Sequence, residues 1–111
     1  MAKKKGGRRD KRKGEMPLPN EEEGTMLCVV RRNLGGGFLE VFCKDGEIYK
    51  AWIPGKMRRR AWMREGDVIL FLPWGSRDMK GEVVYRYLRD EVKKLMEMGL
   101  ITEEFIEEGM E

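Results

Sequence analysis

The apolar residues between positions 26 and 87 fall into five short runs, which cover residues 26–32, 37–43, 47–53, 68–72 and 82–87. Short apolar runs bounded by glycine, proline, asparagine or aspartate are typical of β-strands. Lys44-Asp45-Gly46 predicts a hairpin turn, because glycine can adopt the positive φ that such turns require. A second turn is expected at Asn33-Leu34-Gly35-Gly36, between the first two strands.

Five strands in about 65 residues, with a longer connection between the third and fourth, predict a mainly β protein built on a five-stranded barrel. An SH3-like barrel is the main alternative, because periodicity alone does not separate the two. Phe38 and Phe42 lie out of phase with Leu39, Val41 and Cys43. This pattern predicts either a strongly curved second strand or aromatic side chains on its outer face.

The residues after the barrel follow a helical pattern. Leu88, Val92, Leu95 and Met96 lie at i, i+4, i+7 and i+8, which predicts an amphipathic helix that ends at Gly99. A short second helix is expected after Thr102 as N-cap, with Ile101 and Ile106 placed as a hydrophobic staple. The predicted organisation is a disordered basic arm and acidic linker (residues 1–24), the barrel (25–88) and a C-terminal helical extension (89–111).

The net charge of +3 is distributed unevenly along the chain. Residues 1–14 hold eight basic residues and one acid, whereas residues 89–111 hold three basic residues and eight acids. Basic blocks of this kind often bind nucleic acid, because each neutralised phosphate releases counterions. A solubilising tail is the alternative. The expected RNA-binding residues of the arm are Lys3, Lys4, Lys5, Arg8, Arg9, Lys11, Arg12 and Lys13.

The composition argues against an enzyme, and no cofactor or metal is expected. Histidine is absent and Ser76 is the only serine, so the usual catalytic bases and nucleophile pairs are missing. Cys28 and Cys43 lie inside apolar runs, which predicts two half-buried thiols on neighbouring strands rather than a metal or redox site. No apolar run is long enough to span a membrane, and a cytoplasmic protein is expected. The abundance of Lys, Arg and Glu is typical of proteins from hot environments.

A cluster of cations lies between the third and fourth strands. Four basic side chains fall within five residues and are flanked by Met57 and Trp62; they are Lys56, Arg58, Arg59 and Arg60. Consecutive side chains point in different directions, so the three arginines cannot share one face. A folded RNA that presents phosphates on two sides suits this geometry, and the guanidinium fork matches phosphate. We expect one of Met57 and Trp62 to pack into the core.

The aromatic residues leave alternatives open. Phe38 and Trp52 stand on the outer face of the barrel and stack on bases, or they cover its open end. Trp74 is expected to be a packing residue at the end of the fourth strand. Tyr85 and Tyr87 are expected in the core or against a helix.

These segments together strongly resemble archaeal translation initiation factor 1A. The resemblance is carried by Asn33-Leu34-Gly35-Gly36-Gly37-Phe38-Leu39-Glu40-Val41-Phe42-Cys43-Lys44-Asp45-Gly46, by Ile53-Pro54-Gly55-Lys56-Met57-Arg58-Arg59-Arg60-Ala61-Trp62 and by Arg64-Glu65-Gly66-Asp67-Val68-Ile69-Leu70. It covers roughly residues 14–100, and the basic arm resembles the family's N-terminal tail.

The resemblance implies an oligonucleotide-binding (OB) fold and an initiation factor bound near the decoding region, in the aminoacyl-tRNA site of the small ribosomal subunit. It implies help for initiator methionyl-tRNA binding and start-site selection. The implied partners are small-subunit ribosomal RNA, a ribosomal protein at that site, other initiation factors and, indirectly, initiator tRNA and mRNA; no membrane is expected, and the free protein is expected to be a monomer. The expected RNA-binding residues are Lys56, Arg58, Arg59, Arg60, Trp62, Arg64, Trp52 and Phe38.

The chain also departs from the family pattern. The family usually has basic residues where this chain has Phe38 and Trp52, so the barrel face is less cationic here. A general single-stranded RNA binder or RNA chaperone of cold-shock type is the alternative function. A protein-interaction module that works through the acidic helix pair is a third.

Overall fold

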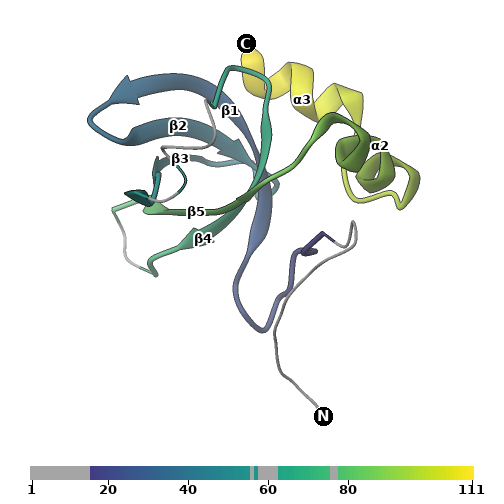
Figure 1. Cartoon of the computed structure of the whole chain (residues 1–111), viewed down its shortest axis with the longest axis horizontal. Coiled ribbons are helices and arrows are strands. Elements are labelled where there is room, and N and C mark those ends of the chain that lie inside the picture. The colour runs from purple at the N-terminus through teal and green to yellow at the C-terminus, as the bar shows by residue number, and fades with distance from the viewer. Residues whose placement is uncertain (1–15, 56, 58–62, 76–77) are drawn as a thin grey trace.

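The protein is a closed barrel of five strands followed by two helices (Figure 1). The computed structural model describes residues 16–55, 57, 63–75 and 78–111. The barrel order is β1-β2-β3-β5-β4, in which β3 and β5 pair in parallel and the other neighbours are antiparallel. The elements are β1 (Met26–Gly35), β2 (Phe38–Cys43), β3 (Ile48–Trp52), β4 (Val68–Pro73), β5 (Lys80–Arg86), α2 (Arg89–Glu97) and α3 (Glu103–Met110). The predicted five-stranded OB barrel with C-terminal helices is confirmed; the basic arm lies outside the described residues.

Two strands are buried on both faces over part of their length, β1 at residues 27–30 and β4 at residues 68–71. One face of each contributes to the barrel interior, with residues such as Val30 and Phe71, and the other lies under the helices, with residues such as Val29 and Leu70. A strand covered on both faces needs apolar residues at every position. This is why residues 26–30 and 68–72 read as unbroken apolar runs rather than as alternating ones.

The second strand alternates cleanly. Leu39, Val41 and Cys43 point into the barrel and are fully buried. Phe42 lies on the outer face, where it stacks on Phe105 of α3 with ring centroids 5.3 Å apart. Of the two alternatives for the out-of-phase phenylalanines, the structure therefore has the aromatic side chains on the outer face.

The turn between β1 and β2 lies further along the chain than predicted. β1 continues through Gly35, and the turn falls on Gly36 and Gly37, both with positive φ. The Asn33 side chain accepts a hydrogen bond from the Gly35 backbone N–H at 2.8 Å, next to two irregularities in the pairing with β2. A bulged strand accommodates the extra residues without ending, so an asparagine–glycine signal predicted the turn too early.

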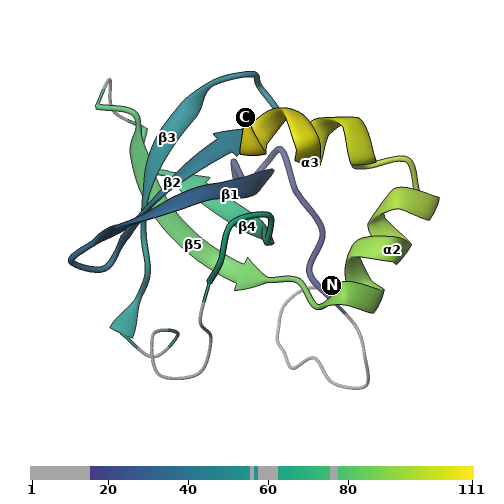
Figure 2. The same ribbon diagram turned by 90° about the horizontal axis from the view of Figure 1, so that it is seen from above.

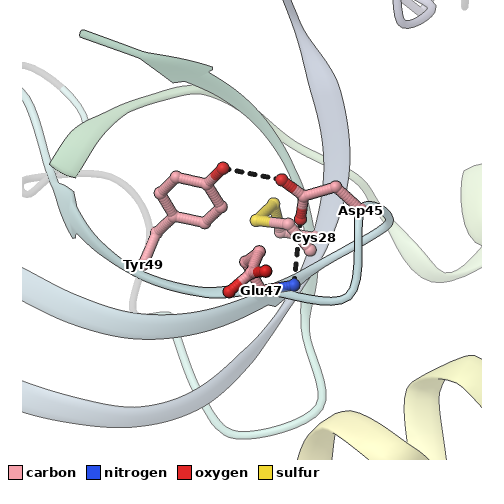
Figure 3. Close-up of a disulfide and its surroundings, with 5 residues drawn as sticks. Cys28, Asp45, Glu47 and Tyr49 are labelled. Atoms are coloured by element: carbon pink, nitrogen blue, oxygen red, sulfur yellow. Dashed lines mark hydrogen bonds between the residues drawn. A yellow bond between two sulfur atoms is a disulfide. The ribbon is translucent and has the colours of Figure 1, made fainter. Parts of the chain in front are cut away.

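The expectation of two free thiols is wrong, because Cys28 and Cys43 form a disulfide inside the barrel (Figure 3). The two residues are direct partners in the β1–β2 pairing, and their Cα atoms are 4.0 Å apart. Both are fully buried. The sequence pattern placed them on neighbouring strands, but whether they face each other depends on the register, which the bulges in β1 set.

The hairpin turn beside the disulfide forms as predicted. Gly46 has a φ of 86°, and the Asp45 carboxylate accepts hydrogen bonds from the Glu47 backbone N–H and the Tyr49 hydroxyl. The Tyr49 bond is 2.6 Å long and is drawn in Figure 3. This hydrogen bond, with burial, raises the pKa of Tyr49 to about 12, so the hydroxyl keeps its proton and remains a donor at neutral pH.

Helix α3 lies against the outer side of the barrel over β1 and β2, and α2 lies to one side, beyond the end of β5 (Figure 2). Thr102 is the N-cap of α3, as predicted, and its hydroxyl accepts a hydrogen bond from the Phe105 backbone N–H. Ile101 and Ile106 both join the apolar cluster between the helices and the barrel. Tyr85 and Tyr87 pack against the same cluster, which confirms their expected role.

The start of the described chain also packs on the barrel. Met16 joins the apolar cluster under the helices, and the Tyr87 hydroxyl donates a 2.6 Å hydrogen bond to the Pro17 carbonyl oxygen. The side chain of Asn20 caps a turn by accepting from Glu22 N–H. Residues 16 and 17 are therefore held against the barrel, beside the helices.

Gly109→Ala is expected to lower the free energy of unfolding by roughly 1–3 kcal/mol. A Cβ at this position would overlap the Val29 side chain and lie 3.2 Å from Phe42. An alanine inside a helix normally stabilises it, so the expected sign is opposite to the helix-propensity effect. Thermal unfolding measures the change, and Glu108→Ala, at an exposed neighbouring position, is the control. A Gly109→Ala variant as stable as the native chain would contradict the close contact.

Candidate nucleic-acid interface

The basic loop between β3 and β4 is bounded at both ends by residues that pack into the barrel. Ile53 before it and Met63 after it are each 6% exposed, and Met57 packs against the same barrel-interior cluster. The Met57 backbone N–H donates to the Pro54 carbonyl oxygen at 2.9 Å, which closes a turn at the start of the loop. The expectation that one of Met57 and Trp62 packs into the core is confirmed for Met57.

The start of the loop lies beside the turn that joins β1 and β2. The Ile53 backbone N–H donates a 2.8 Å hydrogen bond to the Gly37 carbonyl oxygen. Lys56, Arg58, Arg59, Arg60 and Trp62 themselves lie outside the described residues, as do the eight cations of the arm. Arg64, the first charged residue after the loop, is exposed. The loop is thus fixed at both ends and begins at one end of the barrel.

Phe38 and Trp52 form a pair on the outer face of β2 and β3. They are direct partners in the strand pairing, and their ring centroids are 5.1 Å apart. Lys50, the next outward residue of β3, places its Nζ 5.6 Å from the centroid of Phe38. Both aromatics are half-buried, so part of each ring system is accessible. The structure thus supports the outer-face alternative over coverage of the open end of the barrel.

Trp74 extends this aromatic face, contrary to the expectation that it packs. Its side chain is 47% exposed, and its Nε1 donates a 3.0 Å hydrogen bond to Glu82, the β5 partner of Trp52. β4 ends at Pro73, and Trp74 directly follows it, with its side chain turned to the surface. The sequence predicted that Trp74 packs because the apolar run of residues 68–72 does not indicate where the wall of the barrel ends.

Lys50 and Lys80 were not among the predicted site residues. They are partners in the parallel pairing of β3 with β5 and add two cations beside the aromatic pair. The sequence could have predicted that Lys50 lies on this face. It is two residues before Trp52 in β3, and residues two apart in a strand share a face. Nothing in the sequence placed Lys80 there, since its position depends on a parallel pairing between distant segments.

The comparisons with known proteins match nearly the whole chain, including the basic loop. The family model described as translation initiation factor 1A / IF-1 matches residues 13–110. The translation initiation factor 1A of Aeropyrum pernix is 70% identical over 104 residues, which is 94% of each chain. That of Desulfurococcus amylolyticus is 49% identical over 107 residues, 96% of this chain and 92% of the relative.

The chain belongs to the translation initiation factor 1A family. A third relative, from Thermococcus kodakarensis, is 42% identical over 95 residues, 85% of this chain and 81% of its own. The sequence-based identification is therefore confirmed. Family membership gives the chain a role in translation initiation, and it places the chain among translation factors rather than among enzymes.

Two arginines of β1, Arg31 and Arg32, are already bonded within this translation initiation factor 1A and are therefore less available to RNA. Arg31 donates to the Glu40 carboxylate at 2.9 Å and to the Gly109 carbonyl oxygen at 3.0 Å. Arg32 donates to the same carboxylate. Hydrogen bonds from Arg31, helped by Arg32, hold the pKa of Glu40 below its usual range. These residues tie α3 to β1 and β2, so we assign Arg31 a structural role.

Within the described ranges, the structure offers no cluster of three or more metal-ligating side chains. The helices of the described chain also include none that is long and apolar enough to cross a membrane. What the described surface brings together is cations and accessible aromatic rings, the combination that proteins use for single-stranded or unstacked nucleic acid.

Proposed function

We propose that this protein binds the small ribosomal subunit at the aminoacyl-tRNA site, near the decoding region. Bound there, it promotes initiator methionyl-tRNA binding and start-site selection in the cytoplasm. Its direct partner is small-subunit ribosomal RNA, and initiator tRNA, mRNA and other initiation factors act through the same complex. The observation that carries the proposal is the family match, which extends through the basic loop and both helices.

Two features of the structure support RNA contact by the loop. Its ends are anchored by Ile53, Met57 and Met63, so the cations between them extend from a fixed base. A fixed base limits the entropy lost when the loop meets a rigid partner. The adjoining face carries Phe38, Trp52 and Lys50 in place of an all-cationic surface, and base stacking on exposed rings contributes ~1–3 kcal/mol per base.

Co-sedimentation with purified small subunits, followed by chemical probing of the RNA, tests the proposal. We expect saturable binding and protection of bases in the decoding region. Binding that leaves the decoding region unprotected would contradict the proposed site.

A general single-strand binder is the second candidate, and the accessible rings of Phe38, Trp52 and Trp74 favour it. A generic oligonucleotide separates the two functions. We expect a single-stranded oligouridylate to compete poorly with the small subunit. Equal competition by oligouridylate would favour the single-strand binder over the initiation site.

Deletion of residues 1–14 is expected to weaken small-subunit binding and to leave the thermal unfolding transition in place. The deleted residues carry eight cations that can neutralise phosphates, and the deletion leaves in place Met16, which packs against the apolar cluster under the helices. Binding is measured by co-sedimentation and unfolding by circular dichroism. Loss of the transition would show instead that the arm is part of the fold.

A further inference from the structure

A groove separates α2 from the barrel on the side where β5 ends. It has a volume of about 680 Å³ and is lined by the turn at Arg64–Val68, by the end of β5 and by one face of α2. Figure 2 shows α2 beside the barrel, joined to it through the end of β5. The size is that of pockets that hold several side chains or a small ligand.

The α2 side of the groove combines apolar and cationic side chains. Val92 and Met96 are half-buried, and Leu88 is 53% exposed. Arg89 and Lys93, one helical turn apart, are exposed. Neither cation has a side-chain hydrogen bond or ion pair with another residue of the described chain. By contrast, Arg86 at the end of β5 is already paired with Asp67 at 3.3 Å.

Two of these residues occupy positions where helix stability favours other residue types. Leu88 is the N-cap of α2, where Ser, Thr, Asp or Asn would satisfy a free backbone N–H. Arg89 is in the first turn, where the helix dipole disfavours a cation. The start of α2 is held instead by Glu91, whose carboxylate accepts a 2.8 Å hydrogen bond from the Leu88 backbone N–H, and by the acidic residues Asp90 and Glu91 in the first turn. The side chains of Leu88 and Arg89 are thus not needed to begin the helix, and both lie where a partner could contact them.

We propose that this groove docks an amphipathic segment of a partner protein, with apolar side chains in the groove and carboxylates along the edge that faces Arg89 and Lys93. Amphipathic helices bind grooves of this kind through apolar anchors at helical spacing, and a methionine in the wall adapts to their shape. The charge of the α2 edge selects carboxylates as the complementary groups.

Apart from Arg64, which belongs to the expected RNA-binding set, the lining of the groove favours a protein segment over RNA. Its one aromatic residue, Tyr87, is 3% exposed, so no ring is accessible for base stacking. Glu65 and Glu103 also line the groove and are exposed. They would repel a continuous phosphate backbone, whereas a peptide can confine its carboxylates to the α2 edge.

Fluorescence anisotropy with a designed peptide tests the proposal on the full chain, without ribosomes and so independently of the proposed function. The probe is a labelled amphipathic helix of about 14 residues, four turns, with leucines on one face and glutamates on the other. A matched peptide has lysine in place of each glutamate. We expect the glutamate peptide to bind saturably and at least about tenfold more tightly than the lysine peptide. The difference arises because glutamates attract Arg89 and Lys93 on the α2 edge, whereas lysines repel them.

Two variants of the groove are expected to weaken glutamate-peptide binding by at least about tenfold, the effect of losing an apolar anchor or a cationic edge. They are Leu88→Ser and Arg89→Glu/Lys93→Glu. Leu88→Ser also supplies a better N-cap, so its melting temperature should be unchanged or higher, which separates lost docking from lost folding. The charge-matched control Lys44→Glu/Lys94→Glu, on exposed residues that do not line the groove, should leave peptide binding nearly unchanged.

Several results would overturn the proposal. These are no saturable peptide binding, equal binding of the lysine peptide, or an affinity that Leu88→Ser leaves unchanged. An oligouridylate that displaces the peptide, and whose own binding Leu88→Ser weakens equally, would assign the groove to RNA. Self-association of the chain that Leu88→Ser abolishes would assign it to a second copy.

Discussion

The variant Arg58→Ala/Arg59→Ala/Arg60→Ala is expected to bind the small ribosomal subunit roughly 100- to 500-fold more weakly than the native chain at ~0.1 M salt. If each arginine meets a phosphate, the salt slope of binding should fall by about 0.7–0.9 per contact, which is roughly a five- to eightfold loss per contact at that salt concentration. The fold should survive, because the residues that anchor the loop, Ile53, Met57 and Met63, are untouched.

Binding measured at several salt concentrations provides both the affinity and the slope. Arg32→Ala/Lys44→Ala/Lys94→Ala removes the same total charge from exposed positions outside the loop and is the matched control. We expect its slope to stay close to the native value. A loop variant with an unchanged slope would show that the arginines do not contact phosphates, whatever its affinity.

Cys28→Val/Cys43→Val is expected to lower the free energy of unfolding by ~3 kcal/mol, because the disulfide closes a loop of about 15 residues in the unfolded chain. For a domain of this size, that corresponds to a drop of roughly 12–24 °C in melting temperature. Valine fills the buried positions with apolar side chains, so the loss reflects mainly the missing crosslink.

Reductant provides the internal control for this second prediction. Native protein refolded in reductant should melt near the temperature of the valine variant, and reductant should not affect that variant. The disulfide is fully buried, so refolding rather than simple incubation is needed to reduce it. A valine variant that melts within a few degrees of the oxidised native chain would contradict a stabilising crosslink.

Buried disulfides inside cells are characteristic of hyperthermophilic organisms, which agrees with the charge-rich composition.

Local signals were enough to predict the strand count, the hairpin turn and both helices. Gly46 and Thr102 each fix a local geometry through their own chemistry, and the structure has both as expected. The pairing of Cys28 with Cys43 could not be predicted in the same way. It depends on register, which the bulges of β1 decide, and a shift of one residue would place the two thiols on opposite faces.

Long-range contacts account for the other differences. No local pattern in the sequence indicates that Arg31 bridges Glu40 and the carbonyl of Gly109, which is 78 residues away from it. Charge density in the sequence predicts an RNA site in the loop and the arm, whose cations lie outside the described residues. The aromatic face was predicted only in part, because Trp74 and Lys80 reach it through the pairing of β5 with β3 and β4.

The covering of β1 by α3 sets an order for biosynthesis. Val29, in the first strand, is shielded by Gly109 and its neighbours, close to the far end of the described chain. Chains emerge from the ribosome N-terminus first, so a nascent barrel presents bare apolar surface on β1 until residues 101–110 have been made. A participant in the first step of protein synthesis thus buries its own first strand only after every other strand of its barrel has been made.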